Sequence, residues 1–128
     1  MRAVLISLLL ACDVACAEVI ECPPAYPLAS TPLASDSKAF ASRSLLFGGG
    51  VFIGELGGIG EMRGDNRTVK GGQDVRFGFG PKEPRWFVCT YGRDGGISSW
   101  RAIDAKATSC MMRRRTREGV TTVRADCK

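Results

Sequence analysis

The chain has 128 residues, the length of one domain, and it contains no histidine. This composition excludes a Ser-His-Asp triad, a Cys-His pair and a His-ligated zinc site. A hydrophobic content of 45% with 24% charged residues is typical of a folded globular domain, and the net charge is +5 at pH 7. The sequence therefore predicts a folded basic protein without histidine-dependent catalysis or histidine-ligated metal.

The first 17 residues have the order of a secretory signal peptide. Met1-Arg2 supplies the positive start, Ala3 to Ala11 is almost entirely apolar, and Ala15-Cys16-Ala17 is a small-residue cleavage site. The apolar run is far shorter than the ~20 residues that span a bilayer. We expect cleavage after Ala17, a periplasmic or secreted protein, and a single domain over residues 18–128.

A second interpretation of the N-terminus stays open. Leu9-Leu10-Ala11-Cys12 is similar to a bacterial lipobox, in which Cys12 would carry lipid after cleavage. Lipid attachment of this kind would hold the protein at a membrane surface. The alternative localisation is therefore a lipoprotein anchored through Cys12.

Residues 18–33 are rich in proline, and Cys22 precedes Pro23, which disfavours helix at that point. We expect an extended N-terminal arm held by Cys22. Further along, Ser44–Phe47 and Val51–Leu56 flank Gly48-Gly49-Gly50 without any phosphate-loop motif. The glycines are expected to punctuate two short strands.

The middle of the chain alternates turn signals with strand patterns. Gly64-Asp65-Asn66 and Gly71-Gly72 predict turns. Residues 75–79 alternate apolar and other side chains, residues 86–91 are aromatic and β-branched, and residues 97–103 can return as a strand. With no long helical period, the pattern predicts an all-β or β-rich domain, either a small antiparallel sheet or a barrel-like arrangement.

Removing the leader leaves four cysteines, which in an exported chain favour two disulfides with three possible connectivities. A two-residue turn at Glu118-Gly119 would place Cys110 opposite Cys127 in a non-hydrogen-bonded pair. There the Cα atoms approach to ~4.5 Å and a disulfide can close. Cys22 would then pair with Cys89, although a one-residue shift of the turn would remove the argument for both pairings.

The last hairpin is strongly basic. Six basic and two acidic residues between 113 and 128 account for +4 of the net charge. The predicted register turns four arginines outward and leaves Arg114 on the inward face, where a charge is unexpected. The candidate anion-binding residues are Arg113, Arg115, Arg117 and Arg124.

Two interpretations of these arginines stay open. The hairpin is either a solubilising sheet edge or an anion-binding surface for phospholipid, lipopolysaccharide, nucleic acid or an acidic protein. No stacking aromatic residue adjoins the basic strip, which disfavours nucleic acid, and Trp86 and Trp100 are expected in the core.

The pattern resembles a family of small exported proteobacterial proteins of uncharacterised function. The likeness rests on Cys22-Pro23, Val51-Phe52-Ile53-Gly54, Trp86-x-x-Cys89-x-Tyr91, Cys110 and Cys127. It implies bacterial export and a disulfide-bonded fold, and it supplies no activity.

We expect a non-catalytic binding or inhibitory module of the bacterial envelope, with no cofactor and no metal. The alternatives are a purely structural envelope protein and a carboxylate-based hydrolase. A two-carboxylate glycosidase would need a pair of carboxylates about 5–9 Å apart, and the carboxylates here are scattered among turns.

Overall fold

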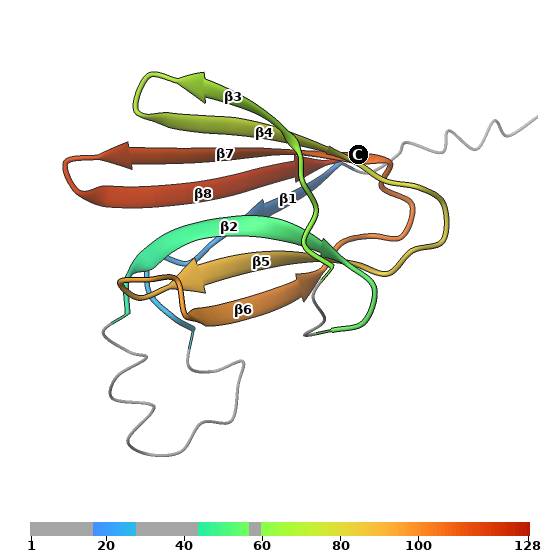
Figure 1. The fold of residues 1–128 in the computed structure, drawn as a ribbon, viewed down its shortest axis with the longest axis horizontal. Helices are drawn as coiled ribbons and strands as arrows, with labels where there is room; N and C mark the ends of the chain where they lie inside the picture. Colours follow the sequence, from blue (N-terminus) through green and yellow to red (C-terminus); the bar gives the residue numbers. More distant parts are fainter. Residues whose placement is uncertain (1–16, 28–43, 57–59) are drawn as a thin grey trace, which may run out of the picture.

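Two antiparallel sheets face each other across the hydrophobic core (Figure 1). The computed structural model describes residues 17–27, 44–56 and 60–128. One sheet has the order β1-β8-β7-β4-β3 and the other the order β2-β5-β6. The strands are β1 (Glu18–Glu21), β2 (Leu46–Ile53), β3 (Asp65–Val69), β4 (Gly72–Gly78), β5 (Arg85–Tyr91), β6 (Ile97–Ala102), β7 (Ser109–Arg117) and β8 (Val120–Cys127). The predicted all-β fold class is confirmed.

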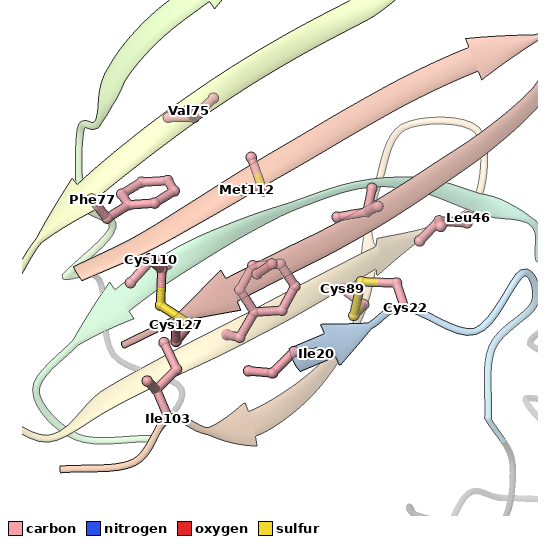
Figure 2. Close-up of a cluster of buried hydrophobic side chains, with 14 of the residues drawn as sticks. Ile20, Cys22, Leu46, Val75, Phe77, Cys89, Ile103, Cys110, Met112 and Cys127 are labelled. Atoms are coloured by element: carbon pink, nitrogen blue, oxygen red, sulfur yellow. A yellow bond between two sulfur atoms is a disulfide. The ribbon is translucent and has the colours of Figure 1, made fainter. Parts of the chain in front are cut away.

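The core lies between the sheets because alternate residues of each strand point inward. Phe87 and Tyr91 of β5 are fully buried, and Met112 of β7 and Val123 of β8 are nearly so. Figure 2 shows Met112, Phe77 and Val75 lying toward the opposite sheet. This alternation is the period of two that strands impose on a half-buried surface.

Both predicted disulfides are present (Figure 2). Cys22, directly after β1, is bonded to Cys89 of β5, with Cα atoms 5.7 Å apart, so this disulfide joins the two sheets. Cys110 of β7 is bonded to Cys127 of β8, with Cα atoms 4.1 Å apart, inside one sheet. The first bond fastens the arm to the core, and the second closes the last hairpin.

The register of the last hairpin is the predicted one. Arg117 pairs with Val120 across the turn, and Cys110 pairs with Cys127 at the far end. Glu118 and Gly119 have φ values of 51° and 76°. Two successive positive φ values are typical of the type I′ turn, whose twist matches that of the flanking strands.

The triple glycine does not separate two strands, as the sequence had suggested. Leu46–Ile53 is one strand that runs through it. A Cβ at Gly49 would lie 3.0 Å from Val123 Cγ1 and 3.0 Å from the Val88 carbonyl oxygen. Glycine at position 49 therefore lets β2 pass close to β8 of the other sheet.

A second correction concerns Gly64-Asp65-Asn66, which the sequence assigned to a turn. Asp65 and Asn66 begin the edge strand β3, in which Asp65 pairs with Arg76 and Asn66 with Val75 of β4. Because most of β3 is exposed on both faces, its sequence does not show the alternation of apolar and polar residues by which a half-buried strand is recognised. Charged residues are common on such edges because they oppose pairing with another chain.

The predicted extended arm is partly a strand. β1 pairs with β8, and the Cys22 amide donates to the Val123 carbonyl. Residues 28–33 of the arm and residues 1–16 of the predicted signal peptide, including Cys12, lie outside the described residues.

Candidate functional site

The four candidate anion-binding arginines lie on the outer face of the five-stranded sheet, as predicted, since they alternate with the buried Met112, Val123 and Ala125. The hairpin is not a sheet edge, however. β8 and β7 are the second and third strands of that sheet, and its edges are β1 and β3 (Figure 1). The predicted position of these arginines at a sheet edge is therefore wrong.

Arg113 and Arg124 face each other across β7 and β8, and Asp126 is two positions from Arg124 on β8, where it contacts both. One oxygen of the Asp126 carboxylate accepts from Arg113 Nη1, and the other lies 3.4 Å from Arg124 Nη2. Arg124 also pairs with Glu21 of β1 at 3.2 Å. The anion that two opposed arginines require is thus supplied by the chain itself.

Arg115 is neutralised in the same way. Its Nη2 lies 2.6 Å from Asp74 Oδ1 on β4, and its Nη1 donates to the Gln73 carbonyl. Among the described residues, Arg117 is the one member of the predicted set without an ion pair. In the predicted basic strip, arginines therefore alternate with carboxylates, and little unneutralised positive charge remains to bind an external anion.

Arg114 occupies the position that the register could not explain. It points from β7 toward β2, beyond the apolar part of the core, where Nε donates to the Phe47 carbonyl at 3.2 Å. Its guanidinium carbon lies 5.9 Å from the centroid of the Phe47 ring. Within the described residues, Arg114 has no carboxylate partner. A carbonyl dipole and an aromatic face stabilise its charge, but no carboxylate among the described residues neutralises it.

An open groove of about 540 Å³ adjoins Arg114 at this end of the two sheets. We call it the end groove; its lining includes Leu45, Phe47, Arg93, Arg114 and Thr121. Leu45 is 69% exposed and Phe47 is 45% exposed, although both are large and apolar. Arg93, like Arg114, forms no ion pair with any residue that the structure describes. The groove therefore joins exposed apolar surface to two unpaired positive charges.

Sequence reasoning did not identify the end groove. Its two arginines are 21 positions apart, and Phe47 was assigned to a short strand before the glycines. The single signal was Arg114 itself, an arginine at an inward position of an otherwise regular hairpin.

Arg85, which is buried, has a structural role. Arg85 is 4% exposed and donates to the carbonyls of Gly80, Glu83 and Ala107. Its guanidinium lies 4.6 Å from the Phe79 ring centroid. These bonds satisfy the charge and fasten two loops to the start of β5, so Arg85 offers nothing to a ligand.

Trp86 and Trp100 are not in the core. Both are half-buried on the outer face of the three-stranded sheet. Trp86 is next to the inward-facing Phe87 on β5, and Trp100 of β6 pairs with Val88, which lies on the same face as Trp86. Their assignment to the core is corrected on this geometry.

In the part of the chain that the structure describes, no group of three or more Cys, Asp and Glu side chains is placed to hold a metal ion. Within the same residues, no helix is long and apolar enough to cross a membrane. The chain matches no family model, no curated protein and no solved structure. The resemblance to exported proteobacterial proteins therefore stays a prediction.

Proposed function

We propose that the protein is an exported, non-catalytic binding module that takes an anionic amphiphile in the end groove. By anionic amphiphile we mean an apolar chain that ends in a carboxylate or phosphate. The observation that carries this proposal is the unpaired guanidinium of Arg114 beside the exposed side chains of Leu45 and Phe47. The outward arginines of the hairpin are weaker candidates because Asp126, Asp74 and Glu21 already neutralise three of them.

The geometry of Arg114 suits this role. Its Nε is held by the Phe47 carbonyl, which orients the planar guanidinium, and no hydrogen bond occupies its Nη groups among the described residues. Two parallel N–H donors match the two oxygens of a carboxylate or phosphate. The apolar chain of the ligand would cover Leu45 and Phe47, which otherwise stand in water.

Export is part of the proposal. Two disulfides fit a protein that folds outside the reducing cytoplasm. β1 begins at Glu18, so cleavage after Ala17 would leave every described strand whole. We expect the exported protein to begin at Glu18, and intact-mass measurement checks this. A lipid-modified Cys12 at the N-terminus would contradict cleavage after Ala17 and support the lipoprotein alternative.

The binding experiment compares two variants that each remove one positive charge. Arg114→Gln removes it from the end groove, and Arg117→Gln removes it from the exposed end of the hairpin. For dodecyl phosphate, measured by calorimetry below its micelle concentration, we expect Arg114→Gln to raise Kd roughly tenfold or more. The loss of a charge-assisted hydrogen bond costs about 1.5–3 kcal/mol, which corresponds to that change. Arg117→Gln should leave Kd within about twofold.

Two further comparisons separate the two parts of the site. Dodecyl maltoside has the same chain without the anion, and we expect it to bind more weakly than dodecyl phosphate. Leu45→Ser should weaken dodecyl phosphate and leave ethyl phosphate unchanged. Equal weakening by Arg114→Gln and Arg117→Gln would mean that diffuse positive charge attracts the ligand, and the end-groove proposal would be wrong.

A further inference from the structure

The outer face of the three-stranded sheet differs in chemistry from the rest of the surface. In the register of these strands, Phe52 pairs with Trp86, and Gly50 pairs with Val88, which pairs with Trp100. The alternate positions of β2, β5 and β6 that share this face carry no charged residue, and the structure describes all three strands in full. The outer face of the other sheet carries arginine and aspartate at the corresponding positions.

The aromatic side chains on this face are held in place. Phe52 and Trp100 have ring centroids 4.7 Å apart with planes inclined at 55°. Trp86 Nε1 donates to the Gly54 carbonyl at 3.0 Å, and Trp100 Nε1 donates to Ser98 Oγ at 2.9 Å. Both indole N–H groups are therefore satisfied while the rings stay half-exposed. A ligand would meet aromatic surfaces that are already ordered, which lowers the entropic cost of binding.

Gly50 lies beside these rings at a position with room for a Cβ, which would make only ordinary van der Waals contacts with Glu61 and Phe52. A Cβ at Gly50 would come no closer than 3.8 Å to any neighbour, and Gly50 is not among the glycines with positive φ. Neither packing nor backbone conformation requires glycine there, in contrast to Gly49. A glycine inside a strand weakens it, and one reason for such a position is the close approach of a ligand.

Polar groups surround the aromatic rings. Thr90 and Ser98 share the face, and Glu61 Oε1 lies 3.8 Å from the position of a Gly50 Cβ. Flat aromatic surfaces beside a few hydroxyl and carboxylate groups match a ligand that has both apolar C–H faces and hydroxyls. An anionic ligand would find no positive charge at the positions of this face, and Glu61 would repel it.

We propose that this surface, which we call the neutral face (Gly50, Phe52, Trp86, Thr90, Ser98 and Trp100), binds an uncharged oligosaccharide. Sugar rings stack on Trp100 and Trp86, and their hydroxyls donate to Glu61 and exchange hydrogen bonds with Thr90 and Ser98. The site is separate from the end groove and from its anionic ligand. A second copy of the chain fits less well, since pairing two neutral faces would bring like-charged Glu61 side chains to one interface.

The experiment uses the fact that Trp86 and Trp100 are the two tryptophans of the chain, so intrinsic fluorescence reports on the neutral face. The probes are an N-acetylglucosamine tetramer and maltotetraose, with heparin as the anionic comparison. We expect at least one neutral tetramer to change the emission in a saturable way, and heparin to leave it unchanged. Trp100→Ala should weaken binding of that tetramer, measured by calorimetry, at least tenfold.

A pair of glycine variants provides the matched control. Gly50→Leu places a side chain on the neutral face, whereas Gly78→Leu places one at the end of β4, where a Cβ has no neighbour within 4 Å. Near-ultraviolet circular dichroism and Tm show whether each variant is folded. We expect Gly50→Leu to abolish saccharide binding and Gly78→Leu to retain it.

Three outcomes would overturn the proposal. The first is the absence of any emission change with either tetramer at millimolar concentration. The second is tighter binding of heparin than of the neutral tetramers at this face. The third is a concentration-dependent emission change without ligand that Gly50→Leu removes, which would identify the face as an interface between copies of the chain.

Discussion

Tyr91 shows how a single polar atom in the core affects stability. Its side chain is fully buried, and its hydroxyl has no hydrogen-bond partner among the described residues. Burial, and then the neighbouring Tyr26, raise the pKa of the Tyr91 hydroxyl from 10.0 to about 12. Tyr26 packs edge-on against it, with ring centroids 5.5 Å apart. The packing of the Tyr91 ring therefore stabilises the folded state, whereas its buried hydroxyl without a partner destabilises it.

We therefore expect Tyr91→Phe to be as stable as the parent protein at pH 8 or more stable by about 1 kcal/mol, because the unpaired hydroxyl is removed. The pH dependence has a defined sign. The folded protein keeps the phenol proton to a higher pH than the unfolded chain does. The free energy of unfolding is therefore unaffected by this titration below pH 10, and it falls as the pH rises from 10 to about 12. Tyr91→Phe should lack that loss.

Urea unfolding at pH 8, 10 and 11.5 measures both effects. Tyr26→Phe is the control, since it removes a neighbouring hydroxyl from the same cluster. If Tyr91→Phe loses more than about 1 kcal/mol at pH 8, the Tyr91 hydroxyl has a hydrogen-bond partner in solution.

At the scale of the strands, the outer face of the five-stranded sheet depends on Asp126. The carboxylate contacts both Arg113 and Arg124, so its removal leaves two like charges directly opposed. We expect Asp126→Asn to lower the free energy of unfolding by about 1 kcal/mol, which is the upper range for an exposed pair. Asp94→Asn, which removes the same charge from an exposed turn, should change it by less than about 0.5 kcal/mol.

Salt provides the internal check for this prediction. At 1 M ionic strength the Debye length is about 3 Å, so the repulsion between the two arginines is screened and the difference between the variants should shrink. A difference that persists at 1 M salt would mean that Asp126 stabilises the hairpin through packing or hydrogen bonding more than through charge.

At the scale of the whole molecule, the two disulfides have different tasks. Cys22–Cys89 joins the sheets and closes a separation of 67 residues, whereas Cys110–Cys127 joins hydrogen-bonded neighbours and closes 17. In the chain-entropy description these loops contribute roughly 4 and 3 kcal/mol. We expect the double serine variant of Cys22 and Cys89 to be the less stable of the two in urea unfolding.

Amide hydrogen exchange, measured strand by strand, distinguishes the roles of the two disulfides. Loss of Cys22–Cys89 should increase exchange of the amides of β1, because the arm then keeps only non-covalent contacts, namely its strand pairing with β8 and its backbone hydrogen bonds near the start of β2. After loss of Cys110–Cys127, the amides of β7 and β8 should still exchange only when the whole protein unfolds. Equal exchange of β1 in both variants would contradict the anchoring role of the inter-sheet bond.

The predictions that succeeded were local. The turn at Glu118-Gly119 sets the hairpin register because a two-residue loop leaves one pairing, and that register places Cys110 opposite Cys127. The strand predicted over residues 86–91 was also a local signal, since these residues are mostly aromatic or β-branched, and the observed strand β5 begins one residue earlier. Such signals need nothing beyond the neighbouring residues.

The predictions that failed needed a distant partner. Glycine at position 49 reads as a strand breaker until Val123 of another sheet is placed against it. Arg113 and Arg124 read as free charges until Asp126, Glu21 and the strand order are known. The end groove arises where residues from β2, β7 and the turn after β5 converge, which no window of sequence contains.

The sequence by itself predicted the all-β class, the Cys110–Cys127 pairing and the inward and outward faces of the last hairpin, because strand period and turn length act over short distances. With four cysteines, the Cys22–Cys89 pairing then followed by elimination. The tertiary structure alone decided which surfaces are available to a ligand. Sheet order brings carboxylates to most of the outward arginines and leaves Arg114 without one, and it turns both tryptophans away from the core. Charge neutralisation and exposure depend on side chains far apart in the chain, so they follow from the packing of the two sheets.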